Sequence, residues 1–332
     1  MLKQCLLTAA AAGITTLASA EIVLNGAGAS FPAPVYQNWT YRYSQATPGV
    51  TVNYQSIGSG AGVNQIKAGT VTFAGSDNPL SQEEQRKAGL HQFPMLTGGV
   101  VVIVNLPGVA DNAMKLDGAT LGDIYLGKIT RWDAPEIRAL NPDLKLPALK
   151  ITVVRRADAS GTSFIFTDYL SKVSPAWRDQ VGAGSAVKWP LGIGGQKNPG
   201  VCNNVAKIRG AVGYTEYTYA YEAKLTMVQL RNRAGKFVSA DTKSFSAGAA
   251  NADWANAPGL CMNLTDQPGD ASWPIVGVTY CLFRDDIKPE EKKALFQYFN
   301  WCYTAGREAA EKLNYVPLPD NVIELVRKTV LK

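Results

Sequence analysis

The strongest constraint on the fold of this chain is a pattern that recurs along it: an apolar, strand-like run ends in a turn of small residues, and the turn opens a helix-like run. The clearest copy joins the β-branched run 151–154 to the helical spacing of 164–170. Three further copies lie at 26–32, 57–63 and 73–80. In an open α/β sheet, the loops at the carboxyl ends of the strands converge on one crevice. The pattern therefore predicts an α/β fold with a ligand site where the turns meet.

The turn at 155–162 has the composition of an anion site. Ser160 is a candidate N-cap, Gly161 lets a ligand approach the backbone closely, and the first amides of the helix have no partner within it. A helix start of this kind attracts anions. Arg156 adds a planar fork of donors suited to phosphate or carboxylate, and Asp158 can hold that fork in place. Taken alone, the segment also fits a solvated arginine pair beside an ordinary capped turn.

The N-terminus predicts export. Lys3 precedes an apolar run at 6–12, and small residues follow at 18–20, which is the pattern of a secretory signal peptide cleaved after Ala20. The apolar run is shorter than the roughly 18 residues of a membrane span. Cys5 precedes this run instead of following the cleavage site, which argues against a lipid anchor. We expect residues 1–20 to be removed and the remainder to be soluble and long enough for two domains.

Charge and glycine spacing argue against nucleic acid and nucleotide cofactors. The formal net charge is +6, but lysines and arginines are scattered along the chain, whereas a nucleic-acid surface needs a clustered basic face. The turn at 25–34 lacks the third glycine of a dinucleotide fingerprint, and no P-loop sequence occurs. We therefore predict no bound cofactor and no nucleic-acid partner. The mild positive charge would help to steer an anionic ligand.

Cysteine usage fits export. Removal of the signal peptide leaves an even number of cysteines, which in an oxidising compartment predicts two disulfides. Three pairings are open among Cys202, Cys261, Cys281 and Cys302. Zinc is the alternative, but the chain has no C-x-x-C spacing and no histidine near these residues. No metal site is predicted.

Together these segments resemble the periplasmic phosphate-binding proteins of bacterial ABC-type phosphate importers. The similarity covers nearly the whole mature chain, and it continues beyond the four turns through further motifs. The matching segments are 26–32, 57–60, 76–80, 120–129, 155–164, 210–214 and 253–254.

The resemblance implies an α/β fold of the two-lobed periplasmic binding protein kind, type II-like, with the ligand cleft between the lobes and a two-segment hinge. Lobe I is expected at 21–96 plus 275–332, and lobe II at 97–274. This division favours the disulfides Cys202–Cys261 and Cys281–Cys302, because a bridge between the lobes would obstruct hinge closure.

The resemblance also implies the phosphate ligands. They are Ser30, the Phe31 amide, Ser59, Asp77, Arg156, Ser160, the Gly161 amide and Thr162, with Asp158 orienting Arg156. Asp77 is expected to set selectivity, because a carboxylate repels an anion unless the anion carries a proton for it to accept. Phosphate carries such a proton at neutral pH and sulfate does not, so Asp77 would disfavour sulfate.

A receptor for another oxyanion, such as sulfate, molybdate or a phosphonate, is the nearer alternative, and a secreted phosphatase is the more distant one. Enzyme chemistry is disfavoured because His91 is the only histidine, which leaves a serine nucleophile without its usual base. The implied partners are inorganic phosphate, a membrane permease that accepts the loaded protein and the ATPase that drives release. The protein is expected to act as a periplasmic monomer.

Overall fold

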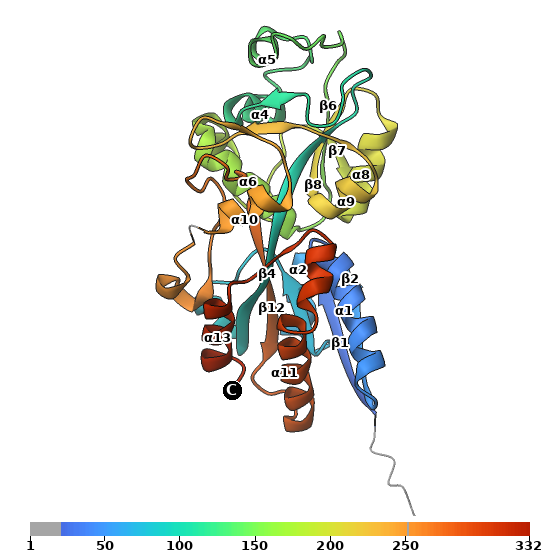
Figure 1. The fold of residues 1–332 in the computed structure, drawn as a ribbon, viewed down its shortest axis with the longest axis vertical. Coiled ribbons are helices and arrows are strands. Elements are labelled where there is room, and N and C mark those ends of the chain that lie inside the picture. Colours follow the sequence, from blue (N-terminus) through green and yellow to red (C-terminus); the bar gives the residue numbers. More distant parts are fainter. Residues whose placement is uncertain (1–20, 251) are drawn as a thin grey trace, which may run out of the picture.

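A computed structural model describes residues 21–250 and 252–332. The predicted signal peptide, residues 1–20, lies outside the described residues. The molecule is elongated and consists of two α/β lobes stacked along its long axis (Figure 1). Within the described residues, no helix is both long enough and apolar enough to cross a membrane.

One sheet runs through both lobes. Its strands are ordered β2-β1-β3-β12-β4-β8-β6-β7. In lobe I, β1 (Ile22–Gly28) is parallel to β2 (Val50–Ser56) and to β3 (Phe73–Ser76). In lobe II, β6 (Thr152–Arg156) is parallel to β7 (Ile193–Gly195) and to β8 (Ala211–Glu216). Parallel strands end at the same edge, so the turns that follow them gather there.

Strand β4 (Leu90–Val104) belongs to both lobes. Its first part pairs antiparallel with β12 (Val276–Arg284) as far as Gly99, and its last five residues pair antiparallel with β8. The chain therefore passes between the lobes along β4 and returns just before β12, as the central strands in Figure 1 show. The predicted lobe boundary at 96/97 falls within β4, and the one at 274/275 falls immediately before β12. Both boundaries stay a prediction.

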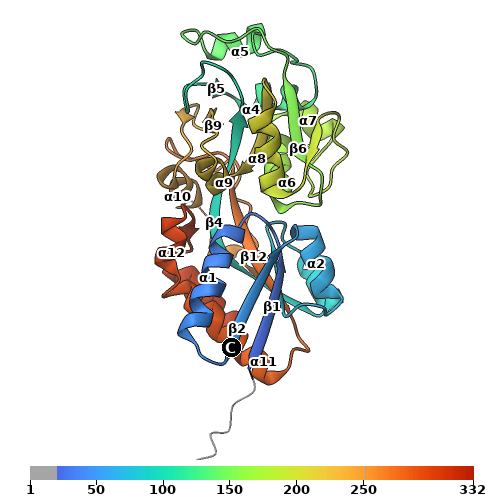
Figure 2. The ribbon, with the colours of Figure 1, turned by 90° about the vertical axis from the view of Figure 1, so that its right-hand side faces the viewer.

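Helices cover the sheet in each lobe, as the turned view also shows (Figure 2). Those of lobe I are α1 (Ala33–Ala46), α2 (Ser59–Lys67), α3 (Gln82–Ala88), α11 (Pro289–Tyr303), α12 (Arg307–Lys312) and α13 (Asp320–Thr329). Those of lobe II are α4 (Gly118–Tyr125), α5 (Pro135–Leu140), α6 (Gly161–Val173), α7 (Pro175–Gln180), α8 (Lys197–Lys207), α9 (Tyr217–Glu222) and α10 (Thr242–Ala250). The remaining short elements are β5 (Lys115–Leu116), β9 (Thr226–Met227), β10 (Gln229–Arg231), β11 (Phe237–Val238), β13 (Val316–Pro317) and the 3-10 turns at Trp254–Asn256 and Pro258–Leu260.

Aromatic packing fixes the turns that face the cleft. In lobe II, Phe166 of α6 stacks on Tyr214 of β8, with ring centroids 4.2 Å apart and ring planes at 8°. The Tyr214 hydroxyl lies 2.6 Å from the Ser163 hydroxyl and accepts a hydrogen bond from the Arg156 amide. In lobe I, the buried Tyr54 hydroxyl donates to the carbonyl of Ala29 at 2.8 Å. These two turns are therefore tied to a core ring as well as to their own strands.

The predicted disulfides are wrong, because all four cysteines of the described residues are free thiols. Cys202 on α8 contacts the hydroxyl of Thr215 in lobe II, whereas Cys261 accepts a hydrogen bond from Gln92 on the lobe I part of β4. Residue 261 belongs to the lobe II segment, but its side chain packs against lobe I, so the two thiols pack against different lobes.

Cys281 and Cys302 are instead buried side chains of the lobe I core. The Cys281 sulfur lies 3.4 Å from the Tyr36 hydroxyl. Burial raises the pKa of the Cys281 thiol to about 12, so it packs as a small, protonated, apolar group.

Candidate functional site

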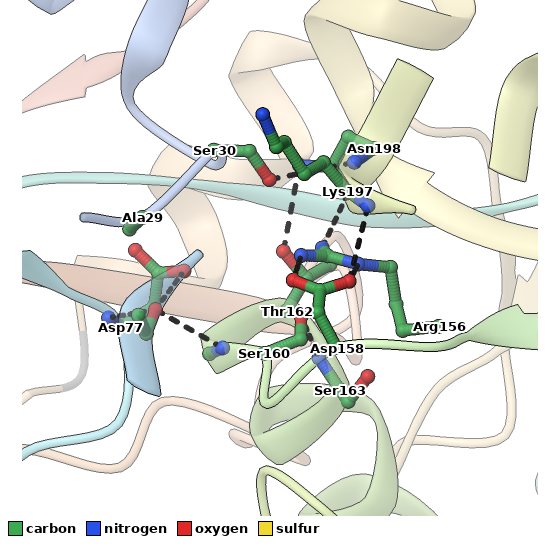
Figure 3. Close-up of polar contacts among 12 residues, drawn as sticks. Ala29, Ser30, Asp77, Arg156, Asp158, Ser160, Thr162, Ser163, Lys197 and Asn198 are labelled. Carbon is green, nitrogen blue, oxygen red and sulfur yellow. Dashed lines mark hydrogen bonds and ion pairs between the residues drawn. The ribbon is translucent and has the colours of Figure 1, made fainter. Parts of the chain in front are cut away.

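The turn between β6 and α6 holds an ion pair between a buried arginine and a partly exposed aspartate. Arg156 is 2% exposed and donates from Nε and Nη2 to the two carboxylate oxygens of Asp158, at 2.9 and 2.5 Å. Burial acts to raise the pKa of Asp158, but the hydrogen bonds and charge of Arg156 outweigh it and hold that pKa below its usual value. The Lys197 amide also donates to Asp158. The pairing predicted from the spacing of these residues fixes the direction of the guanidinium fork (Figure 3).

Helix α6 begins in the way the turn sequence predicts. Ser160 is its N-cap and accepts from the Ser163 amide at 3.1 Å. Ser160, Gly161 and Thr162 are all buried. The positive end of the α6 dipole therefore points into the cleft beside Arg156.

The lobe I side of the site follows β1. Ser30 is 1% exposed and Phe31 is fully buried. Their carbonyls accept hydrogen bonds from two tyrosine hydroxyls, Tyr219 to Ser30 at 2.6 Å and Tyr315 to Phe31 at 2.7 Å. These two hydrogen bonds fix the position of the turn's backbone.

Asp77 follows β3 and is the buried acid of the site, at 2% exposure. Burial raises its pKa to about 7, against the lowering effects of a hydrogen bond from Thr279, the charge of Arg156 and a hydrogen bond from Ser59. The Thr279 hydroxyl donates to Oδ1 at 2.7 Å and the Ser59 hydroxyl to Oδ2 at 3.5 Å. The carboxyl group can therefore exchange a proton near neutral pH.

The two lobes touch across the site. The Gly161 amide of lobe II donates to the Ser59 hydroxyl of lobe I at 3.1 Å, and the Gly60 amide donates to the Ala159 carbonyl at 3.1 Å. A Cβ on Gly161 would lie 2.5 Å from the Asp77 carboxylate and 2.6 Å from the Ser59 hydroxyl. Only glycine permits this approach, so the lobes are closed on one another here.

The site therefore combines many donors with one acceptor. The Ser59 oxygen accepts from two amides, those of Asp77 and Gly161, and the Ser160 oxygen accepts from the Ser163 amide. The Ser160 hydroxyl only accepts in these contacts and so keeps its own proton to donate, whereas the Ser59 hydroxyl donates to Asp77 at 3.5 Å, a long contact that a closer acceptor can replace. With Arg156 and the start of α6, these donors suit an oxyanion, and Asp77 suits an oxyanion that carries a proton.

The nine residues predicted for the site lie on the turns after β1, β2, β3 and β6 or at the strand and helix ends that flank these turns. Two further buried residues were missed. Asn198, at the start of α8, contacts Arg156, Thr162 and Ser30, and Thr279 on β12 holds Asp77. A glycine-rich run at 192–195 precedes α8 and repeats the pattern of the other turns, but β7 is only three residues long and Ile193 is exposed, so no strand signal marks it. Thr279 carries no local signal.

His91 lies outside the site. It is on β4, where its Nε2 contacts the carboxylate of the exposed Asp285 and its ring stacks on Phe283 with centroids 4.9 Å apart. The described residues also contain no group of three or more His, Cys, Asp or Glu side chains placed to hold a metal ion.

Comparisons with known proteins agree with this architecture. The family model of the PBP superfamily domain matches residues 10–305. The phosphate-binding protein PstS of Pasteurella multocida is 45% identical over 328 residues, which span 98% of this chain and 95% of the relative. The PstS of Xylella fastidiosa is 44% identical over 95% of this chain and 88% of the relative.

The fold also matches a solved structure, the phosphate-binding protein from Stenotrophomonas maltophilia. The TM-score is 0.70 at 21% identity, with 94% of this chain and 95% of the other covered. At that identity the likeness concerns the fold alone, whereas the PstS relatives share almost half of their residues with this chain over nearly its full length. The chain belongs to the PstS family of phosphate-binding proteins, within the PBP superfamily.

Proposed function

We propose that this protein binds inorganic phosphate in the cleft between its lobes and delivers it to an ABC-type phosphate permease. The observation that carries the proposal is the placement of one buried acid, Asp77, opposite a set of donors headed by Arg156. The donors can replace the hydration of an oxyanion, and the acid can accept the proton that phosphate retains. An anion without a proton would meet a carboxylate instead.

The proposed ligand groups are those predicted from the sequence, contributed by both lobes. They are Ser30, the Phe31 amide, Ser59, Asp77, Arg156, Ser160, the Gly161 amide and Thr162. Hydrogen bonds to charged groups contribute about 1.5–3 kcal/mol each. Several of them can exceed the roughly 8 kcal/mol of micromolar binding.

Delivery is supported by the family. The relatives are named for phosphate binding, and a binding protein that supplies a membrane transporter must first be exported. We therefore propose that the protein acts in the periplasm, after cleavage behind Ala20, as a monomer that meets a permease and its ATPase. Residues 21–96 plus 275–332 and residues 97–274 are the proposed units that open and close. The hinge would consist of β4 and the segment entering β12.

Two alternatives follow from the same pocket. Receptors for sulfate or a phosphonate would use the same donors, and Asp77 argues against an anion that has lost all its protons. A phosphatase would need an activating base or a metal beside a hydroxyl nucleophile. His91 is the only histidine of the chain, and its contacts with Asp285 and Phe283 lie outside the site.

The test is calorimetric titration of the purified, ligand-stripped protein with phosphate, sulfate and methylphosphonate near pH 7.5. The proposal predicts tight one-to-one phosphate binding and far weaker sulfate binding. Preference for methylphosphonate would support the oxyanion alternative, and release of phosphate from a phosphate ester would support an enzyme. For delivery, the loaded protein should stimulate ATP hydrolysis by the reconstituted permease complex, and the Arg156→Met variant should not.

A further inference from the structure

Asn198 connects three of the anion-binding side chains although it stands in none of the four turns that mark the site. It is fully buried at the start of α8. Its side-chain oxygen accepts from Arg156 Nη1 at 3.3 Å, and its Nδ2 donates to the Thr162 hydroxyl at 3.5 Å. Its backbone amide donates to the Ser30 hydroxyl at 3.4 Å, from the opposite lobe (Figure 3).

The chemistry of the partners fixes the orientation of this amide. A guanidinium group only donates, so the group that faces Arg156 must be the Oδ1 atom of Asn198. The Nδ2 group then faces Thr162 as a donor. The Thr162 oxygen therefore accepts, and the hydroxyl proton is left for another acceptor. The same holds for Ser30, whose oxygen accepts from the Asn198 amide.

We propose that Asn198 is a positioning residue for phosphate: it turns the protons of Thr162 and Ser30 towards the bound anion and holds the end of the Arg156 fork that Asp158 leaves free. Asp158 takes Nε and Nη2 of Arg156, so Asn198 meets the remaining nitrogen. The proposal rests on the proposed phosphate site and assigns a residue that acts on the anion only through others.

The test is a set of phosphate titrations on side-chain variants. Asn198→Ala removes the bonds to Arg156 and Thr162 but keeps the backbone bond to Ser30, and it should weaken phosphate binding by about 10- to 100-fold. Asn203→Ala is the matched control, since Asn203 is exposed on the same helix, and it should bind as the wild type does. The melting temperature of each ligand-free variant checks its fold.

A double-mutant cycle separates positioning from a structural role. In the Thr162→Val background, Asn198 has lost one group through which it acts. The further loss of phosphate affinity caused by Asn198→Ala should therefore be at least about fivefold smaller there than in the wild type. Ser59→Ala serves as the reference background, because Asn198 does not contact Ser59. In the Ser59→Ala background, the loss of phosphate affinity caused by Asn198→Ala should equal the loss in the wild type within about twofold.

Asn198→Asp is the second variant, and it keeps the shape of the side chain. Its carboxylate still accepts from Arg156 but cannot donate to Thr162, and it brings a negative charge to the anion. Its loss should therefore exceed that of Asn198→Ala. Wild-type affinity in either variant, or equal losses in the Thr162→Val and Ser59→Ala backgrounds, would overturn the assignment. Failure of the wild type itself to bind phosphate would overturn the proposed function instead.

Discussion

Replacing Asp77 by asparagine should change which anions the site accepts, and the change should depend on pH. The wild-type carboxyl group has a pKa raised to about 7 by burial. Phosphate brings its own proton to this group. Sulfate brings none, so the carboxylate must either repel it or take a proton from water before sulfate binds.

Magnitudes decide between these two routes. Two unit charges about 4 Å apart repel by about 4 kcal/mol at an effective dielectric constant of about 20. Protonating a group costs about 1.4 kcal/mol for each pH unit above its pKa, which is roughly 2 kcal/mol at pH 8.5 for Asp77. Proton uptake therefore costs less free energy than charge repulsion. Sulfate binding by the wild type should therefore weaken by up to about tenfold per pH unit above 7 and level off below pH 6.

The amide of the Asp77→Asn variant can donate to an anion at every pH, so this dependence should vanish. At pH 8.5 its sulfate affinity relative to phosphate should rise by at least about 30-fold. Calorimetric titration with both anions at pH 6.0, 7.0, 8.0 and 8.5 measures this, with Asp179→Asn as a control at an exposed acid on α7. Sulfate affinity with the same pH slope in wild type and Asp77→Asn, or unchanged selectivity at pH 8.5, would refute the reasoning.

Three further outcomes are expected. Gly161→Ala should lower phosphate affinity by at least about 100-fold, because the new Cβ would meet the Asp77 carboxylate when the lobes close. The unfolding free energy of the ligand-free protein should change by less than about 1 kcal/mol, since that contact forms only on closure. Normal phosphate affinity in this variant would contradict the expectation. Arg156→Lys should lower phosphate affinity by about 10- to 100-fold, since one ammonium group cannot pair with both Asp158 oxygens and the anion. A loss of affinity below about threefold, measured by calorimetry, would contradict the role of the guanidinium group. Burial raises the pKa of Glu216 to about 8 from 4.5, so its stabilising contribution is complete below about pH 4 and lost as the pH rises through 8. Glu216→Gln should therefore flatten the fall in unfolding free energy between pH 5 and pH 8.5, measured by urea denaturation. An unchanged slope would exclude Glu216 as the origin of that fall.

Local signals predicted the strand, the turn and the helix that frame the anion site, whereas the two lobes were expected from the family resemblance. The run 151–154 and the turn after it form β6 and the start of α6, with Ser160 as the N-cap. What the sequence could not show is the path of the central strands. Strand β4 is one uninterrupted strand that pairs with lobe I and then with lobe II, so no loop marks where one lobe ends.

The candidate site, which stays a prediction, could be proposed from the sequence where each residue lies beside a turn with its own signature, as Arg156 and Gly161 do. Thr279 could not be found in this way, because it lies on β12 and meets Asp77 only after antiparallel pairing with β3. The disulfide prediction failed for a related reason. An even number of cysteines says nothing of distance, and the side chains of the predicted partners Cys202 and Cys261 pack against different lobes.

The most direct test of the account is a crystal structure of the protein grown with phosphate. The account predicts one phosphate between the lobes, within hydrogen-bond distance of Arg156, Thr162 and Ser30, with one oxygen against the Asp77 carboxyl group. A phosphate bound elsewhere, or one bound in the cleft with Asp77 turned away from it, would contradict the account.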